Sequence, residues 1–76
     1  MRERILEVIK NFNEELIEDL NKDLLASEML DSFDVVKLVI ALENEFDMEI
    51  DEDYVTPENF QTVNSIINVI IQLVNE

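Results

Sequence analysis

Apolar residues recur at helical spacing in three stretches of the chain. In the first, they lie opposite a charged face, and the apolar stripe comprises Ile5, Val8, Ile9, Phe12 and Leu16. In the second, the stripe comprises Val35, Leu38, Val39, Leu42 and Phe46. In the third, it comprises Val63, Ile66, Ile67, Ile70 and Val74. This spacing predicts three helices, over residues 2–18, from residue 31 or 32 to 46, and from a cap at Thr62 to residue 74.

The segments between these stretches lack a sustained period. From Asp19 to Leu30 the leucines are scattered among polar residues, which indicates a long ordered loop whose leucines enter the core. At 56–60, a threonine cap is followed by Pro57 and an acid, which predicts one short helical turn. No segment alternates with period two, so no sheet is expected. The pattern predicts an all-α fold, a small bundle of three longer helices plus one short helix, in a single domain over residues 1–76.

The composition argues against catalysis by the chain itself. It has no cysteine and no histidine, which excludes disulfides and thiolate metal sites and leaves a serine nucleophile without its usual base. Acidic side chains are abundant, but their spacing picks out no acid and base pair. We therefore expect no enzymatic activity, no catalytic residues and no resident metal.

Charge is distributed unevenly along the chain. The net charge is -14, all five basic residues lie at or before Lys37, and nine acidic residues follow it. Such a chain repels phosphates, so nucleic acid is not an expected partner, whereas proteins with basic patches are. Simple solubility is the alternative explanation for the acids. The N-terminus shows no unbroken apolar run, and no stretch approaches the roughly 20 apolar residues of a membrane span, so we expect a cytoplasmic protein without membrane insertion.

The second predicted helix carries another apolar stripe, away from its core face. At 100° per residue, Phe33, Val36 and Ile40 lie together on this stripe. Polar residues flank it, namely Lys37, Glu43, Asn44 and Asp47. Because a small domain can readily bury only one face of a helix, the stripe predicts a partly exposed docking surface with an acidic rim. Cover by the preceding loop or by a second copy of the chain is the alternative.

Asp31 and Ser32 stand where the long loop meets this two-faced helix. In this setting the chain resembles the acyl carrier protein family, including the peptidyl and D-alanyl carriers, over essentially its full length. The resemblance is carried by residues 30–46, with an Asp-Ser pair at the head and a Leu-Glu-x-Glu-Phe ending, and then by residues 48–50 and 56–63.

The resemblance implies a covalent 4'-phosphopantetheine arm, transferred from coenzyme A to the hydroxyl of Ser32 by a phosphopantetheinyl transferase that Asp31 helps to recruit. Acyl or aminoacyl groups would be carried as thioesters on the arm, whose thiol replaces the missing cysteine. The implied partners are that transferase, an acyl- or aminoacyl-loading ligase and downstream transferases with basic patches, each acting on a monomeric carrier. The surface that the resemblance assigns to partners comprises Phe33, Asp34, Val36, Ile40, Glu43 and Asp47.

Three departures from the family pattern bear on the cargo. Phe33 stands where Leu, Met or Ile is more usual, and Lys37 stands where many fatty acid carriers have an acid. No glycine precedes the Asp-Ser pair, and the chain has none anywhere. These differences argue against a role in bulk fatty acid synthesis, and a dedicated stand-alone carrier, for an amino acid such as D-alanine or for a specialised acyl group, fits at least as well.

Two other functions stay open at this point. An unmodified acidic helical adaptor would use the stripe of Phe33, Val36 and Ile40, with Ser32 acting as a helix cap only. A calcium-binding module would use acids spaced like those of an EF-hand loop, namely Asp47, Glu49, Asp51, Asp53 and Glu58. In that loop, however, Glu52 occupies the place where a glycine is needed, and Pro57 interrupts entry to the following helix.

Overall fold

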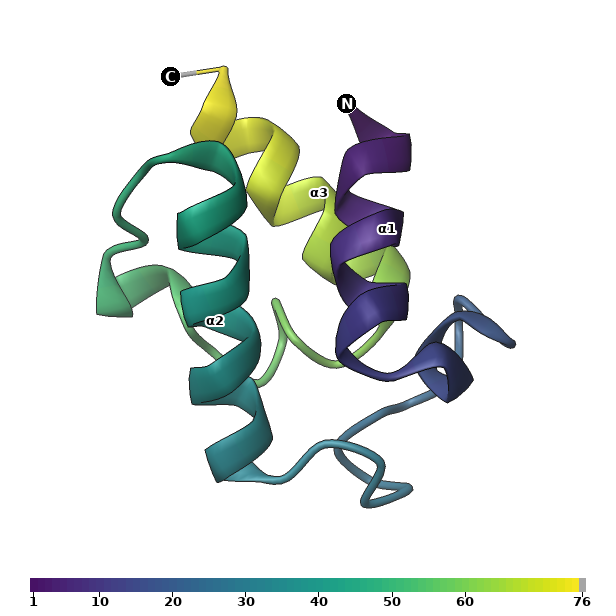
Figure 1. The fold of residues 1–76 in the computed structure, drawn as a ribbon. Helices are drawn as coiled ribbons and strands as arrows, with labels where there is room; N and C mark the ends of the chain where they lie inside the picture. The colour runs from purple at the N-terminus through teal and green to yellow at the C-terminus, as the bar shows by residue number, and fades with distance from the viewer. Residues whose placement is uncertain (76) are drawn as a thin grey trace.

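The computed structural model describes residues 1–75, which form helices and connecting segments without any strand. Three α-helices, α1 (Arg2–Phe12), α2 (Ser32–Phe46) and α3 (Val63–Val74), account for most of the ordered structure. In Figure 1, α1 and α2 flank α3, and the start of α2 lies at the opposite end of the molecule from the N-terminus and the end of α3. The predicted all-α fold is confirmed, as are the bounds of the second and third helices.

The predicted first helix is too long, because the chain leaves the α conformation at Asn13. This residue is extended (φ -160°, ψ 108°), and its side chain accepts a hydrogen bond from the backbone N–H of Glu15 at 3.1 Å. Asn13 thereby ends α1 and caps a short 3-10 helix, η1 (Glu14–Ile17). Leu16 still reaches the core. The hydrophobic period located the buried residue correctly but did not reveal the break, which depends on a local side-chain to backbone bond.

The core lies where the three stripes meet. Every buried side chain among residues 1–75 is apolar. The most deeply buried positions on the helices are Ile5, Ile9, Leu38, Leu42, Val63, Ile66 and Ile70. Burial of these side chains supplies most of the stabilisation, at roughly 1.5 to 3 kcal/mol for each large aliphatic residue. This packing fixes the face that α2 turns inward, and hence the residues it leaves outside.

The segment between η1 and α2 is an irregular loop that enters the core, as predicted. Leu24 and Leu30 are buried, and the N–H of Leu24 donates to the carbonyl of Gln61 at 2.7 Å. The N–H of Asn64 donates to the carbonyl of Leu20 at 3.1 Å. These two hydrogen bonds hold the loop against the start of α3. They thereby help to fix the position of the first residue of α2, which follows the loop.

The connection from α2 to α3 differs in detail from the prediction. It contains a 3-10 helix, η2 (Glu52–Tyr54), that the sequence pattern did not indicate. At 56–60 the predicted short helix is not confirmed: the chain makes a single turn, in which the N–H of Phe60 donates to the carbonyl of Thr56 at 3.1 Å. The predicted cap is present, since Thr56 Oγ1 accepts from the N–H of Asn59 at 3.2 Å. The turn ends by burying Phe60, only 1% exposed, beside α2.

Candidate functional site

The start of α2 is capped by Asp31 and not by Ser32. Asp31 Oδ1 accepts from the N–H of Asp34 at 2.8 Å, and Asp34 Oδ2 accepts from the N–H of Asp31 at 3.2 Å. This reciprocal pair is a capping box, which satisfies backbone donors that a helix start leaves free. Ser32 is the first residue of the helix, so its side chain is not needed as a cap. The role given to Ser32 by the adaptor hypothesis is therefore wrong.

The hydroxyl of Ser32 is free and accessible. The residue is exposed, and its Oγ makes no hydrogen bond to any group of residues 1–75. It lies at the positive end of the helix dipole, where a negatively charged substituent is favoured by about 0.3 to 1 kcal/mol. A hydroxyl in this position can be esterified with phosphate without the loss of any hydrogen bond within residues 1–75.

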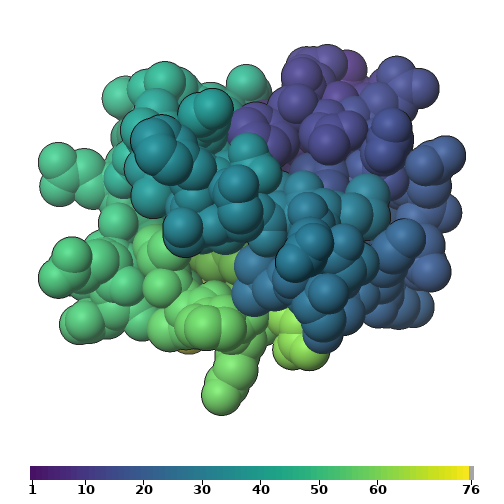
Figure 2. Space-filling model, turned by 90° about the horizontal axis from the view of Figure 1, so that it is seen from below, coloured from purple at the N-terminus to yellow at the C-terminus, as the bar shows by residue number. Residues whose placement is uncertain are grey.

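An apolar pocket opens beside Ser32. It has a volume of about 360 Å³ and lies between α2, the loop before it and the segment after η2. Figure 2, which views the end of the molecule where α2 begins, shows the surface hollowed between the teal atoms of α2 and the green segment that follows η2. The lining comprises Leu25, Val35, Val36, Val55, Pro57 and Phe60 together with Ser32 and Thr56. The sequence pattern does not predict this pocket, because its walls come from three separate segments.

The second apolar stripe of α2 is exposed, as predicted. Phe33, Val36 and Ile40 are 73%, 55% and 50% exposed, respectively. Lys37 Nζ lies 5.5 Å from the centroid of the Phe33 ring, within cation–π range. Val36 also lines the pocket beside Ser32, so the stripe and the pocket form one continuous apolar surface.

The acids expected to border this stripe are not equally available. Asp34 belongs to the capping box, and Glu43 is half-buried with its Oε2 accepting from the N–H of Ile50 at 2.8 Å. Asp47 is exposed at the end of α2 with φ 50°, a conformation that few residues other than glycine adopt. Two of the three predicted acids thus already serve the fold.

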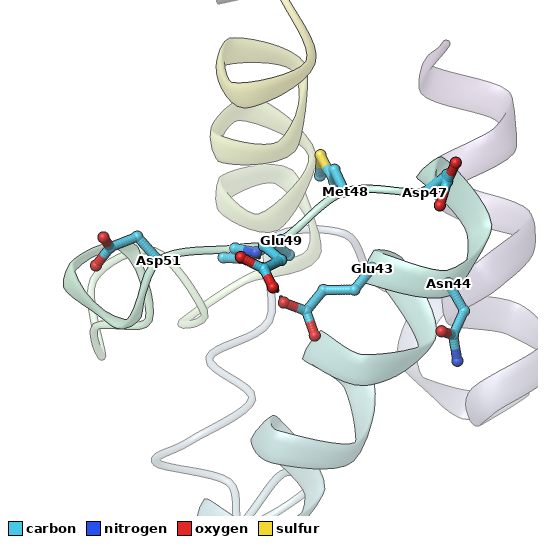
Figure 3. Close-up of a pocket in the computed structure, with 7 residues that line it drawn as sticks. Glu43, Asn44, Asp47, Met48, Glu49 and Asp51 are labelled. Atoms are coloured by element: carbon cyan, nitrogen blue, oxygen red, sulfur yellow. Dashed lines mark hydrogen bonds between the residues drawn. The ribbon is translucent and has the colours of Figure 1, made fainter.

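A larger pocket of about 760 Å³ lies at the far end of α2. Its lining is acidic, and in Figure 3 the carboxylates of Glu43 and Glu49 point toward one another, whereas those of Asp47 and Asp51 point away. Within residues 1–75, no group of three or more acidic side chains is arranged to hold a metal ion. The larger volume of this pocket is therefore not, by itself, a reason to place the functional site there.

Asp23 fixes one wall of the pocket beside Ser32. Its Oδ1 accepts from the N–H groups of Ala26 at 2.8 Å and Leu25 at 3.1 Å, and its Oδ2 accepts from Gln61 Nε2 at 2.8 Å. The bond from the Ala26 backbone, followed by that from Gln61, lowers the pKa of Asp23 below 3.8. The charged carboxylate joins the loop to the start of α3 and so places Leu25, which lines the pocket.

Comparison with known proteins identifies the family. The family model described as the phosphopantetheine attachment site matches residues 2–70. The chain belongs to this family. The D-alanyl carrier protein of Streptococcus suis (strain 98HAH33) is 32% identical over 76 residues, covering 99% of this chain and 96% of the relative. The aminoacyl carrier protein 1 of Bradyrhizobium diazoefficiens is 34% identical over 74 residues, covering 93% and 82%. No solved structure matches the chain.

As a member of the phosphopantetheine attachment family, the chain is a carrier of acyl or aminoacyl groups. It serves as a substrate and shuttle for other enzymes and is not itself a catalyst. Its cofactor is a covalent 4'-phosphopantetheine. No helix within residues 1–75 is long and apolar enough to cross a membrane. The site geometry fits the cofactor, because Ser32 presents a free hydroxyl at a helix start beside an apolar pocket.

Proposed function

We propose that Ser32 carries the 4'-phosphopantetheine arm. The observation that supports this assignment is that Ser32 occupies the first position of α2 with an unbonded, accessible hydroxyl, while its neighbour Asp31 supplies the cap. On the transferase, Ser32 Oγ would attack the phosphorus next to the pantetheine of coenzyme A, and the nucleotide part would leave. No residue of this chain would need to act as a base, because the transferase supplies the catalytic groups.

Asp31 is proposed to assist recognition by the transferase. Its carboxylate is exposed beside Ser32, and its position is fixed by the bond from the Asp34 N–H. A fixed negative charge next to the reacting hydroxyl suits a partner whose surface is basic. Asp31→Asn separates charge from structure, because asparagine caps a helix as well as aspartate does. We expect a folded variant with a lower transfer rate.

Attachment is tested by measuring intact mass. The protein is incubated with coenzyme A, magnesium and a broad-specificity phosphopantetheinyl transferase, alongside Ser32→Ala and the control Ser27→Ala. Ser27 is another exposed serine, located in the preceding loop. We expect one phosphopantetheinyl group on the parent protein and on Ser27→Ala, and none on Ser32→Ala. An unmodified parent protein, with an established carrier modified in the same mixture, would contradict the assignment.

An amino acid is proposed as the cargo, with D-alanine the first to be tested. The support is the similarity to a D-alanyl carrier protein and to an aminoacyl carrier protein over most of each chain. In the test, the arm-bearing protein is incubated with ATP and a ligase that loads D-alanine onto carriers. Either D-alanine or another amino acid is then supplied. A hydroxylamine-sensitive mass increase with D-alanine is expected. Loading of a fatty acid by an acyl ligase, with no loading of any amino acid, would refute the proposal that the cargo is an amino acid.

Partner enzymes are proposed to bind the exposed stripe of α2. The contact surface would combine the apolar residues Phe33, Val36 and Ile40 with the acids Asp34, Glu43 and Asp47. Phe33 is the most exposed large apolar side chain of the described residues, and exposed aromatic residues are typical anchors of interfaces. A broad-specificity phosphopantetheinyl transferase serves as the probe partner for testing this surface.

The test compares Ile40→Glu with Gln72→Glu, which adds the same charge at an exposed position of α3. We expect Ile40→Glu to lower kcat/KM for arm transfer about tenfold or more, with unchanged helical content, because it places a charge in the apolar contact. Gln72→Glu should have little effect. Equal rates for the two variants would remove the stripe from the proposed contact.

The remaining proposals concern the state of the protein. We propose that residues 1–76 form one carrier domain that works as a cytoplasmic monomer. The single turn at 56–60, with its Thr56 cap, would serve as the short fourth helix of a carrier bundle. The match of the family model to residues 2–70 supports the single domain. Sedimentation equilibrium at the mass of one chain would support the monomer, and the mass of two chains would contradict it.

A further inference from the structure

The pocket beside Ser32 lies on one particular side of the attachment point. Ser32, Val35 and Val36 lie on one face of α2, because residues three and four apart are neighbours on a helix. At 100° per residue, Asp34 lies on the other side of the helix from Ser32, and the reciprocal side-chain to backbone bonds of the capping box join it to Asp31. A phosphate on Ser32 Oγ would be repelled by these two carboxylates. The arm should therefore leave Ser32 on the side of the two valines.

Phe60 belongs to both the pocket and the core. It lines the pocket and is only 1% exposed, so the pocket borders the core at this residue. The walls are held in place, because Leu25 belongs to the loop that Asp23 and Gln61 join to the start of α3. The pocket is thus a preformed apolar hollow next to Ser32.

The chemical groups of the arm indicate which part of it fits this pocket. Starting from the phosphate, the arm has a CH₂ group, a quaternary carbon with two methyl groups, a hydroxyl-bearing carbon, two amides and a terminal thiol. The quaternary carbon is the compact apolar part, and it lies close to the serine. The hydroxyl and the amides would lose hydrogen bonds to water in a pocket with six apolar lining residues.

We propose that the pocket beside Ser32 binds the dimethyl group of the arm and leaves the thioester end with its cargo in solvent. This inference rests on the proposed attachment to Ser32. The dimethyl group contacts Val36 and Val55 and faces Phe60. The thiol end then stays accessible to the active sites of partner enzymes, and a polar cargo such as an amino acid remains hydrated.

The test uses protein with ¹³C-labelled methyl groups, modified either with the natural arm or with an arm that lacks the two methyl groups. Intact mass first establishes that each arm is on Ser32. Nuclear Overhauser effects are then measured from the arm's methyl groups to Val36 and Val55, and the melting temperature of each form is recorded. Both arms carry the same phosphate, so their difference isolates the two methyl groups.

We expect Overhauser effects to Val36 and Val55 with the natural arm, and a melting temperature several degrees above that of the form with the demethylated arm. Val36→Thr should reduce this difference, because it adds a hydroxyl to the pocket at an exposed position without changing the shape of the side chain. The control Val74→Thr, on α3 and outside the pocket lining, should preserve the difference.

Three outcomes would overturn the inference in different ways. Arms present on Ser32 without Overhauser effects, and with equal melting temperatures, would refute the pocket assignment while leaving the proposed function intact. Loading of an octanoyl group that displaces the dimethyl signals from Val55 would show that the pocket is for cargo. Absence of any arm on Ser32 would remove both the inference and the proposed function on which it rests.

Discussion

Asp31 caps α2 whereas Ser32 does not, and this difference gives a quantitative prediction for the stability of variants at the two positions. Asp31→Ala removes the acceptor of the 2.8 Å bond from the Asp34 N–H, but the reciprocal bond from the residue 31 N–H to Asp34 Oδ2 can persist. Loss of an N-cap costs about 0.5 to 2 kcal/mol, and survival of the second bond favours a value of about 1 kcal/mol. For a domain of this size, that corresponds to a decrease of about 4 to 8 °C in melting temperature.

Ser32→Ala should behave differently at the next position. The Ser32 hydroxyl has no hydrogen bond to lose within residues 1–75, and the side chain is exposed. Alanine also has a higher helix propensity than serine. The free energy of unfolding should therefore change by no more than about 0.5 kcal/mol, whereas arm attachment should be abolished.

Urea unfolding followed by circular dichroism measures both variants against the parent protein. Asp31→Asn is the matched control, because it keeps the cap and should stay within about 0.5 kcal/mol of the parent. Equal destabilisation by Ser32→Ala and Asp31→Ala would refute the reasoning, since it would mean that the serine hydroxyl has a structural role. A stable Ser32→Ala variant makes loss of modification attributable to the missing hydroxyl.

Three further predictions test the surroundings of the site. Asp23 has a lowered pKa in the folded state, so its stabilising effect is present above its ordinary pKa of 3.8 and is lost as pH falls through the lower folded value. The melting-temperature difference between the parent protein and Asp23→Asn should therefore be smaller at about pH 3 than at neutral pH. Glu28→Gly should raise the unfolding free energy by roughly 0.5 to 1 kcal/mol, because Glu28 has φ 63°, whereas Ser27→Gly should not. Added salt should raise the melting temperature, because nine acids after Lys37 repel one another, and an unchanged midpoint would contradict this.

The site combines three features that meet on one turn of α2. Ser32 is the proposed attachment point, the pocket lies on its valine side, and the exposed stripe begins at Phe33. Val36 belongs to both apolar surfaces, so an enzyme docked on the stripe would lie next to the base of the arm. With the arm on Ser32, as proposed, a small contact on the stripe would position the arm, which suits a carrier that binds and leaves its partner enzymes.

Several features could be predicted from the sequence because they depend on local order alone. The period of apolar residues identified the core stripes, the bounds of α2 and α3, and the exposure of Phe33 and Ile40. The residue order Asp31-Ser32 at a helix start, with its family resemblance, indicates the carrier function without the tertiary structure. Such features follow from helix geometry and from short-range capping, so they are encoded within a few consecutive residues.

Two local features are not recorded by the apolar period: the break at Asn13, which depends on a side-chain to backbone bond, and the positive φ of Glu28. Other features were decided by the tertiary structure. The pocket beside Ser32 needs Leu25, Val36 and Phe60 from three separate segments, brought together by burial of the core and by the Asp23 to Gln61 bond. The sequence by itself determined the apolar faces of the helices and placed a serine at the start of α2. Only the packing of distant segments decided what surrounds that serine, because a pocket is the space left between elements that are far apart in the chain.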